Sequence, residues 1–483
     1  MSELLVVLGA AVVVADYVVK ILALGVLPGN RKPSSAMAWL ILILIVPLAG
    51  FAVFLLFGRT SLGRGRLARQ KEADRAISSA TDKLTPEPVE GPTYLASVVH
   101  LNRNLGSLPL QTGNRVDLIP GYHDSIIAMT AEVAAATESV EVEFYIAAWD
   151  EVTGPFFEAL TAAAARGVKV RLLFDHMGSR SIPGFADFQK RLDATAIEWR
   201  PMLPVRPLKK QFQRPDLRNH RKILVVDGRT AFMGSQNLVE PGYNKPKNHD
   251  AGREWVELVA RVDGPTVRAL RAVFAKDWFT ETGERMDEEI TAVVPTHHSD
   301  GVAAQVLPSG PGYSTENNLR LFTTLIYSAR ARISLTSPYF VPDEPLLYAV
   351  TTAARRGVEI ELFVSEEGDQ FMVSHAQCSY YHALLEAGVR IHLYPAPAVL
   401  HSKHFTIDDD VAVIGSSNMD MRSFALNHEV SMMLTGSDIV ARFRKVEDDY
   451  RALSRELTAE EWSRRPFVQR YLDNTMRLTA ALQ

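Results

Sequence analysis

The sequence predicts an α/β protein with two tandem lobes related by a pseudo-twofold axis, preceded by an N-terminal transmembrane helical hairpin. Three observations lead to this fold class. Apolar residues are concentrated in the first sixty positions, a polar motif occurs twice at a fixed separation, and each copy alternates strand-like and helix-like segments. A chain of 483 residues suits about three structural units, which one anchor and two lobes would supply.

The composition excludes several classes of protein. Charged residues make up 22% and hydrophobic residues 47% of the chain, which excludes a wholly disordered protein. The net charge of −4 argues against a dedicated nucleic-acid binder, because such proteins usually carry a large basic excess. The single cysteine, Cys378, excludes a disulfide framework or a multi-cysteine metal site and suits a reducing compartment.

Two apolar stretches, residues 4–27 and 36–57, are each long enough to cross a bilayer, which takes about 20 residues. Asp16 and Lys20 interrupt the first stretch at an i, i+4 spacing that lets them pair on one helix face. A short turn-forming loop joins the stretches, so residues 1–59 are predicted to form two transmembrane helices. A cleaved signal peptide fits poorly because no basic segment precedes the first stretch, and a buried core hairpin is the other alternative.

Flanking charge predicts the topology. Arg31 and Lys32 lie in the loop, whereas a larger basic cluster that begins at Arg59 follows the second stretch. Because basic flanks stay in the cytoplasm, both termini and the bulk of the chain are expected there. Residues 60–105 are predicted to form a polar, irregular linker, since prolines and charges crowd residues 85–92.

The remainder of the chain contains an internal repeat, which is the first feature to search for in a fold prediction. A His-x-Lys-x4-Asp motif followed by Gly-Ser-x-Asn occurs twice, and equivalent residue numbers differ by 181 (401 − 220) at every matched position. This register predicts one lobe over residues 106–290 and another over 291–483. The matched residues are His220, Lys222, Asp227, Ser235 and Asn237 in the first copy, and His401, Lys403, Asp408, Ser416 and Asn418 in the second.

Each copy has the same predicted order of elements. An alanine-rich helix ends at Gly167 or Gly357, an alternating strand follows, and an apolar strand over residues 140–147 or 333–340 precedes the helix. A further strand carries the His-x-Lys motif. This alternation predicts a mostly parallel sheet, with the two motifs brought together at a face shared by the lobes.

The paired motifs indicate phosphodiester chemistry. Residues i and i+2 of a strand share a face, so each histidine projects with its lysine into one cationic cleft. One imidazole can act as a nucleophile and the other as an acid, while lysine and asparagine side chains suit phosphate oxygens. The arrangement predicts a covalent phosphohistidine.

A nucleophilic imidazole needs an acceptor for its second nitrogen. Glu429 follows His401, and Glu254 follows His220 after a polar insertion, with Asp250 as a competitor. Taken singly, a His-x-Lys motif is usually surface decoration and an aspartate such as Asp227 or Asp408 usually caps a turn. A metal site at His401 and His404 is another alternative, but it lacks a carboxylate partner at matching spacing. Because the motif occurs twice at a fixed separation, an incidental surface role for it is disfavoured.

The two complete motifs resemble those of the phospholipase D superfamily. Within it, the chain is similar to the bacterial cardiolipin synthases through Phe57-Gly58-Arg59, Asn219-His220-Arg221-Lys222 and residues 337–343. This resemblance implies phosphatidyl transfer between two phosphatidylglycerol molecules through a phosphohistidine, giving cardiolipin and glycerol, with no metal or other cofactor. It also implies a multi-pass protein of the bacterial inner membrane.

The resemblance further implies roles for single residues. His220 is expected to be the nucleophile, with His401 protonating the leaving alcohol and deprotonating the acceptor, although sequence symmetry alone leaves this choice open. The two aspartates belong to the catalytic motif. Phosphoryl oxygens are expected to bind Lys222, Lys403, Asn237 and Asn418, with Ser235 and Ser416 nearby.

Other residues around the site fit a lipid substrate. Seven bases between Arg206 and Lys222, among them Lys209, Lys210 and Arg218, predict attraction to anionic phospholipid, with an ordinary solvated face as the alternative. Tyr339 and Phe340 are expected to line an acyl or glycerol pocket or to be ordinary core aromatics. Residues 464–478 are expected to form either an amphipathic membrane-facing helix or a packed core helix.

Three other functions compete with phosphatidyl transfer: a phospholipase D-type hydrolase that releases phosphatidic acid, a superfamily nuclease, and a membrane scaffold with inactive repeats. The apolar anchor and the net charge disfavour the nuclease, so no nucleic-acid partner is expected. Complete motifs in both copies disfavour the scaffold. The sequence is compatible with a homo-oligomer but does not determine the oligomeric state or the acceptor lipid.

Overall fold

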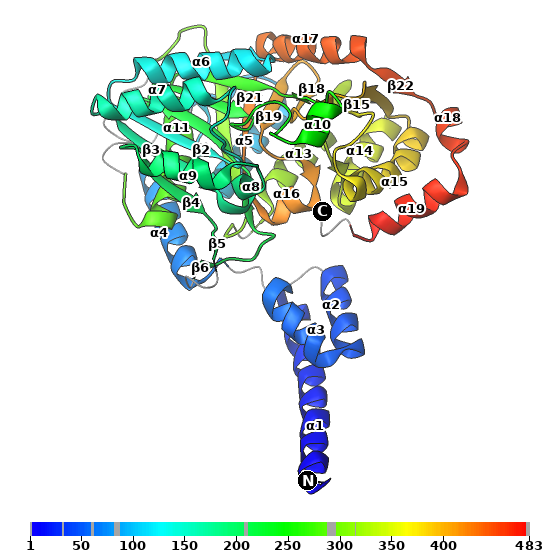
Figure 1. Cartoon of the computed structure of the whole chain (residues 1–483). Coiled ribbons are helices and arrows are strands. Elements are labelled where there is room, and N and C mark those ends of the chain that lie inside the picture. The colour runs from blue at the N-terminus through cyan, green and yellow to red at the C-terminus, as the bar shows by residue number, and fades with distance from the viewer. Residues whose placement is uncertain are drawn as a thin grey trace. The chain divides into compact units, whose positions relative to one another are not determined.

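The computed structural model describes residues 2–30, 33–58, 62–81, 87–206, 211–286, 296–313 and 315–479 (Figure 1). The chain divides into two compact units, Met1–Ser61 with Gln213–Asp216, and Leu62–Phe212 with Leu217–Gln483. Both copies of the repeat therefore belong to one unit. The basic residues Arg31, Lys32, Arg59, Lys209 and Lys210, and the predicted boundary at 290/291, lie outside the described residues.

One helix in the N-terminal unit is long and apolar enough to cross a membrane. This helix is α1 (Ser2–Val26), with its most apolar window at Gly9–Val26, and Asp16 and Lys20 form the expected ion pair at 2.8 Å. After the short η1 (Pro28–Asn30), the second apolar stretch divides into α2 (Pro33–Ile45), α3 (Pro47–Val53) and a π-helical turn, η2 (Phe54–Gly58). The 13 residues of α2 span about 20 Å, less than the roughly 30 Å of a bilayer core.

The break in the second stretch lies at Pro47. Proline has no N–H and disfavours helical geometry in the residue before it, and Val46 adopts φ −132°. At Gly50 the backbone of α3 approaches α2 so closely that a Cβ would lie 2.9 Å from the carbonyl oxygen of Leu42. The described residues thus give one helix of spanning length where two were expected.

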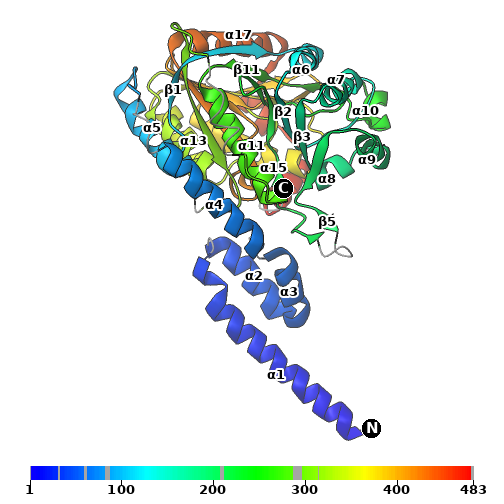
Figure 2. The same ribbon diagram turned by 90° about the vertical axis from the view of Figure 1, so that its left-hand side faces the viewer.

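Residues 60–105 are more regular than expected. They contain α4 (Arg64–Thr81) and α5 (Thr93–Gly106), and within this span residues 87–92 lack regular structure. Helix α4 packs along α11 (Thr266–Thr282), where Arg69 donates to the Thr280 carbonyl at 3.0 Å and Gln70 to the Pro311 carbonyl at 3.1 Å (Figure 2). The expectation of an irregular segment was therefore wrong for α4 and α5, where polar side chains of α4 have partners in the main body, and holds for residues 87–92.

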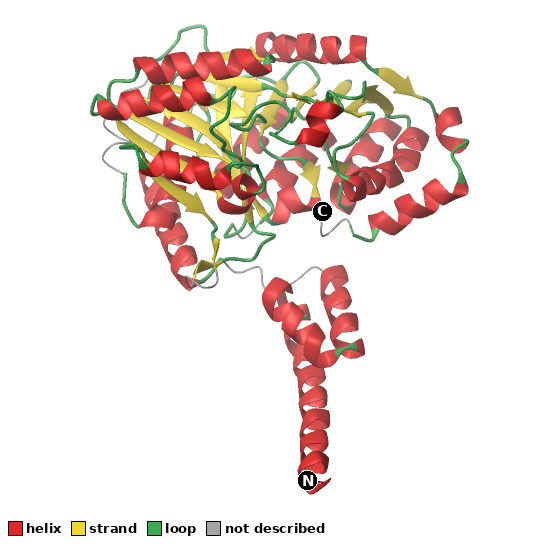
Figure 3. Ribbon diagram, in the orientation of Figure 1, coloured by secondary structure: helices red, strands yellow, loops and turns green. Residues whose placement is uncertain are grey.

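One mixed sheet of sixteen strands forms the centre of the second unit (Figure 3). From the middle outward, both halves show the same order, and β1 pairs antiparallel with β12 where they join. One half runs β1 (Gln111–Ile119), β11 (Val259–Asp263), β9 (Thr230–Gly234), β8 (Lys222–Val226), β2 (Ser139–Phe144), β3 (Lys169–Asp175) and β4 (Glu198–Met202). The other runs β12 (Val302–Ser309), β21 (Asn427–Thr435), β19 (Val411–Gly415), β18 (His404–Ile407), β13 (Arg332–Thr336), β15 (Glu359–Ser365), β16 (Arg390–Tyr394) and β22 (Arg455–Leu457). The sixteenth strand, β7 (Arg218–Asn219), pairs with β21 outside this order.

The prediction of a mostly parallel sheet was wrong. Parallel pairing joins β2 to β3 and β4, and β13 to β15 and β16. The strands that carry the repeated motif instead form hairpins, β8 with β9 and β18 with β19, because a tight turn follows each strand. The central strands continue this antiparallel pattern.

Helices cover both faces of the sheet, which confirms the α/β class. On one face, α6 (Tyr122–Ala135), α7 (Gly154–Ala165) and α9 (Phe185–Asp193) pack on the first half, while α13 (Asn317–Ser328), α14 (Glu344–Arg355) and α15 (Phe371–Ala387) pack on the second. Helices α11 and α17 (Ser437–Leu453) pack against the central strands. Gly167 and Gly357 end their helices at φ +92° and +90°, as predicted.

Shorter elements connect this framework and form part of the site. They are α8 (His176–Arg180), β5 (Val205–Arg206), β6 (Gln211–Phe212), β7 (Arg218–Asn219), α10 (Pro246–Asp250), β10 (Trp255–Val256), β14 (Phe340–Val341), β17 (Val399–Leu400), β20 (Met419–Asp420), α16 (Met421–Ala425), α18 (Ala459–Ser463) and α19 (Phe467–Arg477).

The C-terminal helix α19 combines both predicted characters. One face packs on α15, where Asp473 is buried and accepts a hydrogen bond from His375 at 2.7 Å. The other face leaves Phe467 and Tyr471 exposed by 71% and 62%. Helix α19 is therefore anchored to the body and amphipathic.

Candidate active site

The two His-x-Lys segments meet because each one pairs with a strand of the other half. The His220 N–H donates to the His428 carbonyl at 2.8 Å, next to the parallel pair β7–β21. The His401 N–H donates to the Val256 carbonyl at 2.7 Å, next to the parallel pair β10–β17. The expectation that the two motifs meet at a shared face is confirmed.

A buried glutamate from the opposite half holds each imidazole. Nδ1 of His220 lies 3.0 Å from Glu429 and 3.0 Å from the Ser416 carbonyl oxygen. Nδ1 of His401 lies 2.7 Å from Glu257. An Nδ1–H that donates to these acceptors leaves the lone pair on Nε2, the nitrogen that can attack phosphorus or exchange a proton.

This exchange corrects the predicted acceptors. Glu429 was expected to serve its own copy but contacts His220, and Glu254 is exposed and not in the site. The Glu254 carbonyl instead accepts from the Val399 N–H at 2.8 Å, which sets the register that turns Glu257 toward His401. A signal in the sequence could have identified Glu257: a glutamate directly precedes a mostly apolar run in both Glu257-Leu258 and Glu429-Val430.

The two serines hold these glutamate segments in place. Ser416 Oγ donates to the Glu429 carboxylate and accepts from the Val430 N–H at 3.0 Å. Ser235 Oγ accepts from the Leu258 N–H at 3.0 Å, in the equivalent position. The serines were expected next to a phosphoryl group, but their contacts are with the glutamates and the adjacent backbone.

Both lysines point into the site, together with a tyrosine that the sequence analysis missed. Lys222 Nζ donates to the His220 carbonyl at 2.6 Å, and Lys403 Nζ donates to the His401 carbonyl at 2.7 Å. The Tyr145 ring lies edge-on to His220, with centroids 4.9 Å apart, and Lys222 Nζ lies 5.4 Å from its centre. Tyr145 directly follows β2, a position with no distinctive motif.

Burial and neighbouring cations shift the proton affinities in this cluster. Burial, with Lys222 and Lys403, holds the pKa of His220 well below its usual value. Burial also lowers the pKa of His401, although Glu257 opposes this shift. Burial lowers the pKa of Lys403 to about 8.

The pKa values of the two glutamates are shifted in opposite directions. Burial raises the pKa of Glu429 to about 7, in spite of the nearby Lys222. Burial would also raise the pKa of Glu257, but the charge and hydrogen bond of His401 outweigh it and lower the pKa. The pair His401–Glu257 is therefore the one in which an imidazolium is better stabilised.

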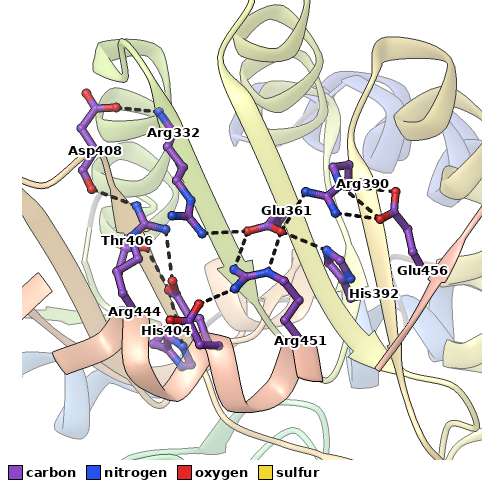
Figure 4. Close-up of polar contacts among 12 residues, drawn as sticks. Arg332, Glu361, Arg390, His392, His404, Thr406, Asp408, Arg444, Arg451 and Glu456 are labelled. Atoms are coloured by element: carbon purple, nitrogen blue, oxygen red, sulfur yellow. Dashed lines mark hydrogen bonds and ion pairs between the residues drawn. The ribbon is translucent and has the colours of Figure 1, made fainter. Parts of the chain in front are cut away.

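The two motif aspartates lie at the far end of their strands. Asp227 accepts from the N–H groups of Glu138 and Ser139 at 2.7 and 2.9 Å. Asp408 accepts from those of Ala331 and Arg332 at 2.8 Å, and Figure 4 shows Asp408 with Arg332. Both adopt a left-handed φ, +51° and +48°. Strand β8 or β18 lies between each aspartate and the histidine of its motif, so the expected catalytic role was wrong and the turn-capping alternative is correct.

The asparagines differ from each other. Asn237 donates to the Tyr243 hydroxyl at 2.9 Å and accepts from the Ile146 N–H at 3.2 Å, so its amide is occupied within the fold. Asn418 Oδ1 is buried without a hydrogen-bond partner among the described residues. Asn418 is thus the asparagine better suited to a ligand.

The described part of the predicted lipid-attracting basic run is largely buried. Arg218 is buried and contacts Asp175 at 3.2 Å, and Arg221 is buried against Asp277. The expectations of a substrate-binding Arg218 and a basic lipid-facing surface were therefore wrong for these residues, because each arginine joins neighbouring strands and helices through an ion pair.

The two predicted pocket aromatics separate. Phe340 is fully buried in the core. Tyr339 is half-buried, its hydroxyl donates to Asp369 at 2.8 Å, and its ring lies edge-on to His401 with centroids 6.4 Å apart. Tyr339 is consequently a neighbour of the site.

His401 and His404 do not form the alternative metal site. His404 faces α17, where its ring packs against Phe443 and lies 3.9 Å from Glu447. Figure 4 shows His404 near a separate charge cluster centred on Glu361. Burial would raise the pKa of Glu361, but hydrogen bonds from His392 and Arg451 outweigh it and lower the pKa, so the cluster is a structural ion-pair network. Among the described residues, no three metal-ligating side chains gather at one point.

Family models and curated relatives match most of the chain. A family model described as "Cardiolipin synthase, PLD-like domain" matches residues 129–278 and 322–449, and one described as "Phospholipase_D-nuclease N-terminal" matches residues 18–59. The chain is 33% identical over 455 residues to cardiolipin synthase A of Proteus mirabilis (strain HI4320), covering 93% of both chains. It is 34% identical over 461 residues to cardiolipin synthase A of Pectobacterium carotovorum subsp. carotovorum (strain PC1), again covering 93% of both.

A solved structure is similar in fold. Phosphatidylserine synthase of Haemophilus influenzae Rd KW20 superposes with a TM-score of 0.61 over 80% of this chain and 99% of its own, at 13% sequence identity. At this identity the likeness concerns the fold alone.

Proposed function

Because the chain belongs to the cardiolipin synthase family of phospholipase D-like proteins, we propose that it transfers a phosphatidyl group from one phosphatidylglycerol to another, giving cardiolipin and glycerol. The observation that carries the mechanism is the reciprocal pairing of His220 with Glu429 and of His401 with Glu257. Two buried lysines beside these histidines supply the positive charge that a phosphodiester requires.

In the first step, Nε2 of His220 attacks the phosphorus of phosphatidylglycerol. The P–O bond to glycerol breaks, and the proton on Nε2 of His401 moves to the departing oxygen. His220 suits the nucleophilic role because burial and the two lysines hold its pKa well below its usual value, and His401 suits the acid role because Glu257 opposes the lowering of its pKa. Lys222 and Lys403 offset charge on the phosphoryl oxygens, and Asn418 Oδ1 is available for a hydroxyl donor.

In the second step, the free hydroxyl of another phosphatidylglycerol gives its proton to Nε2 of His401. Its oxygen attacks the phosphorus, and the P–N bond to His220 breaks. Cardiolipin leaves, and both histidines return to their starting protonation states. No step of this sequence requires a metal or another cofactor.

We further propose that residues 106–290 and 291–483 are two lobes related by a pseudo-twofold axis. Equal strand order in the two halves and reciprocal pairing of the motif segments support this proposal. We propose multi-pass attachment to the bacterial inner membrane through residues 1–59, with the lobes in the cytoplasm. The apolar α1 and the exposed aromatic face of α19 support a membrane location.

Incubating the purified protein with phosphatidylglycerol in vesicles tests the function. Cardiolipin and glycerol should appear in equal amounts, and His220→Ala and His401→Ala should each abolish both. Phosphatidic acid without cardiolipin would reject transfer in favour of hydrolysis. DNA cleavage at a comparable rate would favour the nuclease alternative.

A further inference from the structure

A cavity of about 320 Å³ is lined by Tyr339, whose ring packs edge-on against His401. Residues from β15, α15 and the C-terminal region contribute to its wall, among them Ser365, Gln377, Tyr381 and Trp462. Gln377 Nε2 donates to the Tyr381 hydroxyl at 2.7 Å, so the Tyr381 proton is available to a ligand. Charged side chains, Glu366, Arg455, Glu461 and Arg465, also line the cavity. Hydroxyl, amide and charged groups beside an indole ring suit a small polyol better than an acyl chain.

Two wall residues connect this cavity to the catalytic histidine. Tyr339 lines the cavity and packs edge-on against His401. Ser365 lines the cavity, and its Oγ accepts from the N–H of Leu400, the residue before His401, at 2.9 Å. A group bound in the cavity would therefore lie against the segment that positions His401.

The first half has a buried ion pair at the equivalent place. Asp175 ends β3 as Ser365 ends β15, and Asp175 accepts from the Asn219 N–H at 2.9 Å just as Ser365 accepts from Leu400. Asp175 also contacts Arg218, whose repeat counterpart is Val399. The surroundings of the two histidines therefore differ, with a charged pair near His220 and an open cavity near His401.

We propose that this cavity binds the glycerol head group that departs in the first step and then the glycerol head group of the acceptor phosphatidylglycerol. This inference rests on the proposed phosphatidyl transfer. The same alcohol chemistry occurs in both steps: a glycerol oxygen receives the His401 proton as its P–O bond breaks, and a glycerol hydroxyl returns a proton to His401 as a new P–O bond forms. The asymmetry explains why His401, rather than His220, serves the alcohol.

Filling the cavity tests this assignment in the full-length protein. Cys378 lines the cavity on α15, and Cys378→Phe places a ring there. His382→Phe is the matched control, because His382 is exposed on the same helix and does not line the cavity. If Cys378→Phe does not fold, as judged by thermal unfolding, Ser374→Phe on the half-buried outer wall replaces it.

Two readouts are used with phosphatidylglycerol vesicles: the ratio of cardiolipin to phosphatidic acid, and the KM for labelled glycerol in its exchange into phosphatidylglycerol. The cavity-filling variant should lower the ratio and raise this KM, each by about tenfold, which corresponds to about 1.4 kcal/mol. The control should change neither by more than about twofold on the same scale.

The outcomes separate the two proposals. If the unmodified protein makes cardiolipin and the filled variant keeps the normal ratio and KM, the cavity assignment is overturned while the function stands. If the control changes as much as the filled variant, the assignment is also rejected, since the effect would not be specific to the cavity. If the unmodified protein yields phosphatidic acid alone, the proposed function itself fails.

Discussion

Replacing Glu257 with glutamine should slow cardiolipin formation by about 10- to 100-fold. The carboxylate accepts the Nδ1–H of His401 at 2.7 Å, and both side chains are almost fully buried. A hydrogen bond to a charged group contributes about 1.5–3 kcal/mol, and every 1.4 kcal/mol is a factor of ten in rate. Glutamine has a similar shape but no charge, so the fold should persist.

The assay is the initial rate of cardiolipin formation as a function of pH, with Glu254→Gln as the control. Glu257 raises the pKa of His401 against the effect of burial, so its loss lowers that pKa further. The acid form of His401 is then lost at lower pH, so the alkaline limb of the pH–rate profile should shift to lower pH. If Glu257→Gln lowers the rate by less than about threefold, the loss is smaller than a hydrogen bond to a charged group predicts, and the proposed role of Glu257 is wrong. A larger loss in Glu254→Gln would refute it equally.

Three further changes test other parts of the account. Burial lowers the pKa of Lys403 to about 8, so its charge is lost as pH rises through that value and kcat/KM should fall there. Lys403→Arg should move this fall in kcat/KM to higher pH. A fall at an unchanged pH would contradict the assignment of this titration to Lys403. Asp227→Ala should cost about 1–2 kcal/mol of unfolding free energy with little change in kcat per folded molecule. Burial would raise the pKa of Asp227, but backbone hydrogen bonds outweigh it and lower the pKa. The stabilisation from the charged carboxylate is therefore present at neutral pH and disappears as pH falls through the folded pKa. The difference in unfolding free energy between Asp227→Ala and the unmodified protein should shrink at acid pH, and a constant difference would count against a charged cap. Joint Phe467→Ser and Tyr471→Ser changes should reduce activity on vesicles but not in detergent micelles, and equal losses in both would argue against membrane contact by α19.

The repeat allowed much of the site to be predicted from the sequence. A constant separation of 181 residues identified both histidines and both lysines, and it implied that the two segments meet. It could not identify Glu257, because the polar insertion before it breaks the register between the copies. The exchange of glutamates between halves depends on the β7–β21 and β10–β17 pairs, which are tertiary contacts without a local sequence pattern.

The repeat also did not show which of the repeated residues are catalytic and which are structural. Asp227 and Asp408 occur in both copies because each copy needs the same left-handed turn, and only hydrogen-bond partners reveal this. Composition similarly predicted a second long apolar helix, whereas the chemistry of a single residue, Pro47, divides it. For the aspartates and for the second apolar stretch, the sequence pattern indicated the correct kind of element, whereas local backbone geometry determined its structure.

The most direct test of the central claim is to trap the covalent intermediate. The full-length protein would be mixed with phosphatidylglycerol and quenched in alkali, which preserves a phosphorus–nitrogen bond, and its peptides would be analysed by mass spectrometry. We expect a phosphate-bearing adduct on the peptide containing His220 and none on that containing His401. An adduct on His401 would contradict the assignment of roles, and turnover without an adduct on either histidine would contradict the phosphohistidine mechanism.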